Sequence, residues 1–557
     1  MACHFYLVGD EPSTAQAVEV HSGWKFEDLQ RAVGLAFRVA QPLGISFHDA
    51  ASESLTTVES ILAANTTPDT PLSLRIDSQP VQDPQGPPGL PLVGSFYEIY
   101  PDHLGNHARL FRKYGPVIRT TNMGKTIYLT DDPRVAATCF SESVYMTKKI
   151  NENHPLWGVK DNTAIFIGDT ETENWRLAHK YLPPAMGPKA VRHYTTLMQT
   201  CVRKSLPIFD ELDTRGECWN VYQYMVKLAS ETIGSFSLGK EFGHFKSIDS
   251  ELHPIVTNIA SLLSLNKKIT ARGEWYRHLP FGDPARLRTV QHTIYTMLQD
   301  AVDSVAATST SSDAPTADAA LSASCVVDYL LHAVDDKGAH FPQDLILANM
   351  IIVTGAGFTT TSALLSWLIY SLVTYEGTQE RLYAELIEHG IVRSNGETNT
   401  TTWTPDLAHS LPYLNNFIKE TQRLHNPSFQ PGRTTKSTVI LPGGYRLPPE
   451  SVIVPALYAI HTNPKIWRDP LRFDPDRWET EEVKEMLSKN RCAYVPFATG
   501  ARGCIGFNFA LLEVKILLSE LVSRYEFVRE GVESVDYDPE FQLVRPLNFY
   551  VRAKRRT

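Results

Sequence analysis

The run Phe-Ala-Thr-Gly-Ala-Arg-Gly-Cys-Ile-Gly at residues 497–506 constrains this chain more than any other stretch. Cys504 stands there between two glycines, Arg502 precedes it by two residues, and an apolar run that predicts a helix follows at 507–522. A thiolate is a soft, strongly donating ligand that haem iron accepts. Backbone N–H groups in a glycine-containing loop at the start of a helix stabilise its negative charge. For a lone cysteine a buried free thiol before a core helix is the more common case, so the loop alone leaves both a free thiol and a metal ligand open.

Composition and charge exclude several other classes of protein. The 557 residues are 43% hydrophobic and 21% charged, which is typical of a soluble globular protein. The formal net charge of −9 gives no general affinity for nucleic acid. The seven cysteines are scattered without a C-x-x-C pair. We therefore expect neither a zinc site nor a disulfide framework. The same pattern is typical of a protein in a reducing compartment.

The N-terminal residues 1–16 include Asp10 and Glu11 and lack a long apolar core. We find no run of about 18 uncharged apolar residues, the length that a membrane-spanning helix needs. Neither a signal peptide nor a transmembrane anchor is therefore expected. The prediction is a cytoplasmic protein, with peripheral contact to the endoplasmic reticulum surface left open.

Residues 1–78 have the pattern of a small α+β domain. The predicted elements are strands at 4–8 and 17–21, a helix at 25–39, and strands at 45–47 and 72–76. This order resembles a β-grasp (ubiquitin-like) module. Docking of a partner and simple packing or solubilisation are both open as its role. Residues 79–86 are predicted to be a polar linker.

The main domain is predicted to span residues 87–557. Its first residues, 87–94, are rich in proline and glycine and predict a rigid, non-helical segment. A long apolar helix is predicted at 346–373, with a break at 354–357 where two glycines occur. Glycines inside a helix cost about 1 kcal/mol each relative to alanine. Their presence predicts a groove, or a ligand pressed against the backbone.

The spacing F-x-x-G-x-R-x-C-x-G at 497–506 resembles that of the cytochrome P450 family. The resemblance implies a mainly α fold with small β-sheets, haem b (iron protoporphyrin IX) as cofactor, and Cys504 as its axial ligand. It places Phe497 near the sulfur, where surrounding groups tune the potential of the iron. The lack of an N-terminal anchor departs from most eukaryotic members.

An E-x-x-R pair, Glu420 and Arg423, precedes the cysteine by about eighty residues. Residues three apart lie on one helical face, so their side chains can interact. The family resemblance adds Arg477 and implies a buried structural triad that fixes the cysteine loop.

On the apolar helix, Ala356-Gly357-Phe358-Thr359-Thr360-Thr361 resembles the family pattern A-G-x-D/E-T-T. The resemblance implies that Gly357 loosens the helix and that Thr360 is the oxygen-activating threonine. Thr359 occupies the position of the acid, and a threonine has no useful acid pKa near neutrality. Either water and another group supply protons, or the oxygen chemistry differs from standard monooxygenation.

Two haem carboxylates in an apolar interior need cations or hydrogen-bond donors. The resemblance assigns Arg502, Arg433, Trp175 and His179 to them, with Lys148 as a further candidate. Histidine at 179 replaces the family's arginine, as in the soluble fatty-acid hydroxylase branch. Unlike arginine, its charge depends on pH.

The resemblance implies a monooxygenase that hydroxylates or epoxidises a lipophilic small molecule, such as a secondary metabolite or a fatty-acid-like compound. Electrons would come from an external NADPH-cytochrome P450 reductase. The expected substrate pocket includes Thr354, Phe358 and Phe429. Two alternatives remain open: a haem-thiolate isomerase or dehydratase that acts on a peroxide without a reductase, and a haem-containing sensor. The sequence as a whole resembles fungal members of the family.

Overall fold

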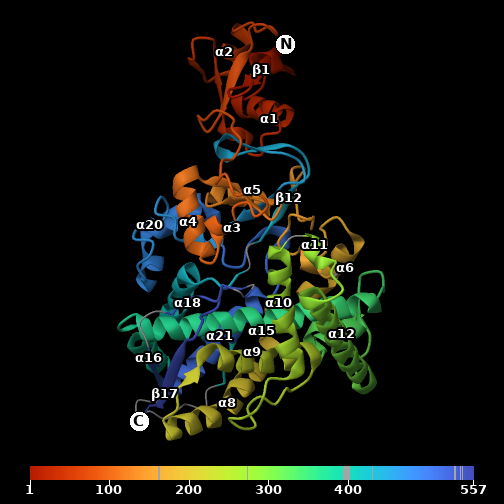
Figure 1. The fold of residues 1–557 in the computed structure, drawn as a ribbon, viewed down its shortest axis with the longest axis vertical. Helices are drawn as coiled ribbons and strands as arrows, with labels where there is room; N and C mark the ends of the chain where they lie inside the picture. Colours follow the sequence, from red (N-terminus) through yellow and green to blue (C-terminus); the bar gives the residue numbers. More distant parts are fainter. Residues whose placement is uncertain are drawn as a thin grey trace.

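The computed structural model describes residues 1–557 except 161–162, 273, 393–401, 429–430, 532–534, 540, 542 and 557. Figure 1 shows a small N-terminal unit above a much larger body in which helices predominate. Small sheets of two to five strands complete the body. The predicted architecture, mainly helical with small sheets, is therefore correct for the body.

The N-terminal unit is one mixed sheet with two helices. Its elements are β1 (Ala2–Leu7), β2 (Gln16–Glu19), α1 (Phe26–Ala36), β3 (Ile45–His48), β4 (Ser54–Leu55), α2 (Val58–Ala63) and β5 (Leu72–Ile76). The strand order is β2-β1-β5-β3-β4, with β1 and β5 parallel and the other pairs antiparallel. Alternate residues of β1, among them Phe5 and Leu7, pack with Leu29 and Val33 of α1 in one hydrophobic core.

This unit shares contacts, and part of its core, with the body. Ile440 of β13 (Val439–Leu441) is buried in the hydrophobic core of the unit. Its backbone N–H and C=O both hydrogen-bond to the segment after α1, at 2.9 Å. Asp77 forms an ion pair with Arg134 of α5 (Pro133–Phe140) at 2.9 Å. The unit is therefore packed against α5 and the β13 hairpin.

The body contains helices α3 to α21. They are α3 (Phe96–Ile99), α4 (His103–Tyr114), α5, α6 (Glu173–Ala185), α7 (Pro188–His193), α8 (Thr195–Arg215), α9 (Val221–Leu238), α10 (Pro254–Ala271), α11 (Glu274–Arg277), α12 (Gly282–Thr308), α13 (Thr316–Ser322), α14 (Val326–His332), α15 (Gln343–Thr374), α16 (Thr378–Glu388), α17 (Pro405–His409), α18 (Pro412–Leu424), α19 (Leu457–His461), α20 (Glu481–Lys489) and α21 (Phe507–Arg524).

Helix α15 runs through the middle of the body (Figure 1). It is continuous over Gln343–Thr374, so the predicted break at 354–357 is wrong. A Cβ on Gly357 would lie 2.4 Å from Ile233 Cδ1 of α9, so this glycine permits the close approach of the two helices. Among the described residues, α15 alone is long and apolar enough to cross a membrane. However, 67% of its most apolar window is buried inside the protein.

The strands of the body bring distant segments together. They are β6 (Val117–Asn122), β7 (Lys125–Thr130), β8 (Met146–Thr147), β9 (Trp219–Asn220), β10 (Ala314–Pro315), β11 (Ala333–Val334), β12 (Arg433–Thr435), β13, β14 (Tyr445–Leu447), β15 (Val452–Pro455), β16 (Tyr525–Glu530) and β17 (Tyr550–Arg555). One sheet has the order β6-β7-β15-β12-β8. Because Thr434 of β12 pairs with Thr147 of β8, Arg433 lies close to the residues that follow β8.

Candidate functional site

A cavity of about 340 Å³ is bounded by α6, α9, α10, α15 and the loop that precedes α21. Most of its wall is apolar, including Ile259, Leu262, Ile352 and Phe509. No Asp or Glu occurs among the described residues that line it, although Lys, His and Arg side chains do. Apolar walls with a few polar side chains suit a lipophilic ligand that carries acidic groups.

Cys504 lies on the wall of this cavity, in the loop between a short 3-10 turn and α21. Its backbone N–H donates to the carbonyl of Phe497 at 2.9 Å, which closes the loop. Phe497 also lines the cavity. Surrounding protein atoms bury the thiol and raise its pKa, while the nearby backbone N–H of Gly506 acts in the opposite direction. Cys504 nevertheless keeps exposed surface, and because the residue lines the cavity we assign this surface to the cavity side.

Gly500 in the same loop has no space for a side chain. Its φ is +76°, and a Cβ there would lie 2.4 Å from the carbonyl oxygen of Phe140 in α5. A larger residue would strain the backbone and displace α5. The loop is therefore fixed in place against α5.

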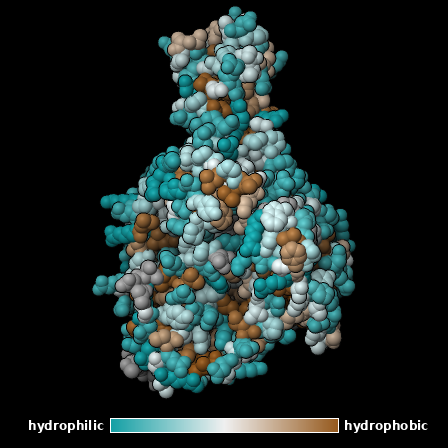
Figure 2. All heavy atoms as spheres, in the orientation of Figure 1, coloured by the Kyte–Doolittle hydropathy of each residue, from teal (hydrophilic) through white to brown (hydrophobic). Residues whose placement is uncertain are grey.

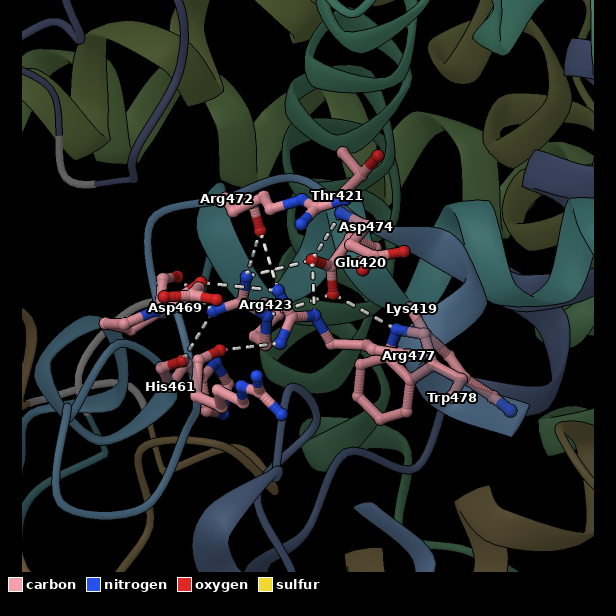
Figure 3. Close-up of polar contacts among 12 residues, drawn as sticks. Lys419, Glu420, Thr421, Arg423, His461, Asp469, Arg472, Asp474, Arg477 and Trp478 are labelled. Atoms are coloured by element: carbon pink, nitrogen blue, oxygen red, sulfur yellow. Dashed lines mark hydrogen bonds and ion pairs between the residues drawn. The ribbon is translucent and has the colours of Figure 1, made fainter. Parts of the chain in front are cut away.

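Figure 3 shows Glu420 between Arg423 and Arg477. Arg423 Nη2 and Arg477 Nε both lie 2.9 Å from Glu420 Oε1. Trp478 Nε1 donates to Glu420 Oε2 at 3.1 Å. Further N–H groups of the two arginines donate to backbone carbonyls within 461–472. The structure thus brings the three predicted residues together, and with Trp478 they form what we call the triad cluster.

Hydrogen bonds connect the triad cluster to the cysteine loop. Arg423 Nη1 donates to the carbonyl of His461 at 3.0 Å, and His461 Nε2 accepts from the backbone N–H of Val495 at 3.1 Å. Burial, followed by the charge of Arg423, lowers the pKa of His461 to about 3, so its ring is a neutral acceptor. Asn426 Nδ2 donates to the carbonyl of Pro496 at 3.3 Å. The backbone that leads to Cys504 is therefore held from two points.

Helix α15 contributes Gly357, Thr359 and Thr360 to the cavity. Thr360 Oγ1 donates to the carbonyl of Ala356 at 2.8 Å, and Thr359 Oγ1 donates to that of Gly355 at 2.7 Å. Both hydroxyls thus bond to the preceding turn of their helix. Each oxygen keeps lone pairs that can accept a further hydrogen bond.

Thr354 and Phe358 do not line the cavity, which corrects the pocket expected from the sequence. Thr354 is buried and shares a 3.0 Å hydrogen bond with Ser237 of α9, and Phe358 is part of the main hydrophobic core. Residues four apart in an α-helix point in nearly the same direction, whereas residues two apart point about 200° away from each other around the helix axis. The cavity face of α15 instead carries Ile352 and Ala356. Phe429, the third predicted pocket residue, lies outside the described residues.

A group of cations and hydrogen-bond donors lines one part of the cavity. Arg502 Nη2 donates to the carbonyl of Gly168 at 2.9 Å, and its guanidinium lies 4.9 Å from the ring centre of Trp175. His179 stacks on Trp175, with ring centres 4.6 Å apart. Arg433 is buried and donates through Nη1 to the carbonyl of Gly432 at 2.9 Å.

Several donors in this group have no hydrogen-bond partner in the part of the chain that the structure describes. They are Trp175 Nε1, Arg433 Nε, Arg433 Nη2 and Arg502 Nη1. Burial, and then the charge of Arg433, lowers the pKa of Arg502 to about 9. Burial also lowers the pKa of Arg433 and of His179. Buried donors without partners are costly, so these atoms fit a ligand with acceptor oxygens.

Lys148 and His154 also belong to this group. We call the whole group the donor cluster, and its members are Lys148, His154, Trp175, His179, Arg433 and Arg502. Lys148 is buried, its ammonium donates to the carbonyl of Phe166, and burial lowers its pKa well below the usual value. Sequence reasoning missed His154, which is buried and lines the cavity. It lies in a loop without a motif, so no sequence signal indicated it.

Comparisons with known proteins agree with this geometry. The family model described as cytochrome P450 matches residues 84–551. The cytochrome P450 monooxygenase alnD of Emericella nidulans is 46% identical over 99% of this chain and 98% of its own length. The bifunctional cytochrome P450/NADPH--P450 reductase ascE of Acremonium egyptiacum is 27% identical over 85% of this chain and 43% of its own length.

A solved structure, the haem domain of cytochrome P450DA, superposes with a TM-score of 0.73. The match covers 85% of this chain and 98% of that one at 20% identity, and it supports the fold. The chain therefore belongs to the cytochrome P450 family as a monooxygenase, and members of this family bind haem b iron through a cysteine thiolate.

Proposed function

We propose that this protein is a haem-thiolate monooxygenase that hydroxylates or epoxidises a lipophilic small molecule. It would use O₂ and electrons from a separate NADPH-dependent reductase. The observation that carries the proposal is one cavity that contains the Cys504 thiol, the Thr360 hydroxyl and the unpartnered donors of the donor cluster. Bound haem supplies the oxygen-activating chemistry.

The residues around the cavity fit haem b. Cys504 is the proposed axial ligand, and Phe497 is the aromatic residue beside it that tunes the iron. Arg433, Arg502 and Trp175 have free N–H groups for the two haem carboxylates, and their lack of other partners supports this role. His179, stacked on Trp175, is the fourth proposed donor.

Thr360 is the proposed proton-relay residue, with Gly357 and Thr359 beside it on α15. Its hydroxyl bonds to the carbonyl of Ala356 and retains the capacity to accept from water. Thr359 is a hydroxyl in place of an acid, and the described lining contains no carboxyl group. We infer that water carries protons to Thr360. Thr360→Ala should lower the rate of product formation by about 100-fold, the usual scale of a positioned proton-transfer group.

The triad cluster has a structural role in this proposal. Glu420, Arg423 and Arg477 hold the segment that leads to Cys504 through His461 and Val495. None of the three lines the cavity. Their loss should therefore affect haem retention indirectly, through the position of the loop.

The apolar wall supports a lipophilic substrate, such as a fatty-acid-like compound or a secondary metabolite. We propose an NADPH-cytochrome P450 reductase as the electron donor. One relative is named as a bifunctional cytochrome P450/NADPH--P450 reductase, which supports a reductase of this kind.

We further propose that residues 1–78 are a β-grasp (ubiquitin-like) domain, 79–86 a linker, and 87–557 the haem domain. The strand order β2-β1-β5-β3-β4 supports the first assignment. The start of the family match at residue 84 supports the boundary. Ile440 in the core of the unit suggests a fixed packing role, while docking of a partner remains a second proposal.

A cytoplasmic location with peripheral contact to the endoplasmic reticulum is also proposed. Figure 2 shows hydrophobic patches over the region of α3 and beside α11, together with further patches elsewhere on the same face. Leu92, Tyr97, Trp275 and Phe281 are large exposed apolar residues near these elements. Such residues favour contact with a lipid surface.

Turnover of a lipophilic substrate with NADPH, reductase and isotopically labelled O₂ tests the proposal. We expect one labelled oxygen atom in the product and no product without NADPH. Rearrangement of a lipid hydroperoxide without reductase, together with no labelled product, would instead identify an isomerase or dehydratase. Haem binding without any turnover would favour a sensor.

A further inference from the structure

His154 lies in the loop between β8 and α6 and is fully buried, with 0% of its surface exposed. Its Nδ1 accepts a hydrogen bond from the backbone N–H of Leu156 at 3.1 Å. A neutral imidazole carries one hydrogen, so this bond assigns the hydrogen to Nε2. Burial, and then the charge of Lys148, lowers the pKa of His154 well below its usual value, which keeps the ring neutral.

The Nε2–H group has no well-formed hydrogen bond in the described part of the chain. It faces Gly432, where a Cβ would lie only 2.7 Å from Nε2. The carbonyl of Gly432 is close enough to raise the pKa of the ring, but its contact with Nε2 lacks the geometry of a well-formed hydrogen bond, and the same oxygen accepts from Arg433 Nη1 at 2.9 Å. Both His154 and Gly432 line the cavity. The donor is therefore buried at the cavity wall and lacks a well-formed hydrogen bond.

The surroundings of this donor indicate the chemistry of that ligand. Lys148, Arg433 and Arg502 are close enough to disfavour a positive charge on the ring. Charged donors of this kind form strong hydrogen bonds with a carboxylate. A neutral N–H adds a hydrogen bond there without adding charge repulsion. The site thus suits a carboxylate group.

We propose that His154 is a positioning residue that donates its Nε2–H to a carboxylate of the bound haem. This inference rests on the proposed haem-binding function and adds a donor that the family motifs do not indicate. His154 holds the cofactor in place and has no part in the reaction itself. The carboxylate of a fatty-acid-like substrate has the same chemistry, so the test must distinguish the two sources.

The test uses the full-length holoprotein and three variants. His154→Phe removes the donor and keeps the ring volume, whereas His154→Gln restores an N–H near the position of Nε2. His425→Phe is the matched control, because His425 also has an unpartnered Nε2 but stacks on Trp367 away from the cavity. The rate of haem transfer to excess apomyoglobin is the main measurement, and the midpoint potential is the second.

We expect His154→Phe to lose haem about tenfold faster, equivalent to ~1.4 kcal/mol. Its midpoint potential should fall, because the carboxylate loses a donor and its negative charge is less compensated. His154→Gln should recover most of the loss, and His425→Phe should retain haem like the wild type. Equal haem-loss rates in His154→Phe and the wild type, with the thiolate carbon-monoxide band intact in both, would overturn this inference alone.

Spectral titration with a long-chain carboxylic acid and its methyl ester separates the two carboxylate sources. We expect His154→Phe to bind both compounds as the wild type does. If His154→Phe binds only the acid more weakly and keeps a normal haem-loss rate, His154 serves the substrate and the assignment to haem is wrong. Absence of the thiolate band in the wild type would instead defeat the proposed function itself.

Discussion

The triad cluster and the donor cluster are two buried groups of cations that differ in whether their N–H groups have partners. In the triad cluster, Arg423 and Arg477 both bond to the carboxylate of Glu420. Their other N–H groups donate to backbone carbonyls. In the donor cluster, two nitrogen atoms of Arg433 and one of Arg502 have no hydrogen-bond partner among the described residues.

This difference indicates which cluster serves the fold and which serves a ligand. Removing one partner of a buried ion pair is costly whether or not a ligand is bound, whereas unpartnered buried donors are costly until an acceptor binds. The triad cluster should therefore contribute to stability in apo and holo protein alike. The donor cluster should contribute only when haem is bound.

The largest expected effect is in the triad cluster. Glu420→Leu leaves two buried guanidinium groups without their anion, so the free energy of unfolding should fall by about 3–5 kcal/mol. Urea denaturation of the apo and holo forms measures it. A loss confined to the holo form would contradict a structural role for Glu420.

Unlike Glu420→Leu, Arg433→Leu should weaken haem binding without lowering the stability of the apo protein. The substitution removes a buried cation with unpartnered donors, so apo stability should be unchanged or higher. Haem dissociation should accelerate by about 10- to 100-fold, because hydrogen bonds to a charged group are worth about 1.5–3 kcal/mol. Arg423→Leu is the matched control and should destabilise the apo protein. Equal effects of the two substitutions on the apo protein would remove the distinction between the clusters.

Glu513 in α21 extends the comparison to a buried carboxyl group without a cation. Neither of its oxygens has a well-formed hydrogen bond among the described residues, and burial raises its pKa to about 8 although the nearby hydroxyls of Thr232 and Thr361 act in the opposite direction. Between pH 4.5 and 8 the folded state keeps a proton that the unfolded state loses, so stability should fall as pH rises. The slope should approach about 1.4 kcal/mol per pH unit.

Glu513→Gln cannot ionise and should be more stable than the wild type above pH 8, with a flatter pH dependence. Chemical denaturation of the apo protein at several pH values measures the slope. A wild-type slope equal to that of Glu513→Gln would show that Glu513 does not retain its proton.

The smallest effect is expected at the exposed contact between the N-terminal unit and α5. The Asp77–Arg134 pair is partly solvent-exposed, and such pairs contribute about 0–1 kcal/mol. Asp77→Asn should therefore change the free energy of unfolding by less than about 1 kcal/mol. A change as large as that of Glu420→Leu would mean that this contact resembles the buried clusters.

The sequence predicted the mainly helical body, and it singled out residues that the structure brings together at the triad cluster and on the cavity wall. These predictions depended on short motifs whose spacing fixes residues on one loop or one helical face. The elements of the N-terminal unit were predicted except for strand β4 and helix α2. These have two and six residues, which is too short for a detectable periodicity.

The predicted pocket residues Thr354 and Phe358 illustrate the limit of this approach. The motif fixed the position of Thr360, and helical geometry then turns Phe358 about 200° away from it. The place of Thr354 beside Ser237 depends on how α15 packs against α9, which short motifs do not show. His154 could not be predicted, because its place beside Gly432 depends on contacts between segments almost 280 residues apart.

The central claim is that Cys504 ligates haem in this cavity. The carbon-monoxide difference spectrum of the reduced full-length protein tests it most directly, with Cys504→Ser measured beside the wild type. We expect a band at the haem-thiolate position in the wild type and none there in Cys504→Ser. A wild-type band at the position of histidine-ligated haem, or an unchanged thiolate band in Cys504→Ser, would contradict the claim.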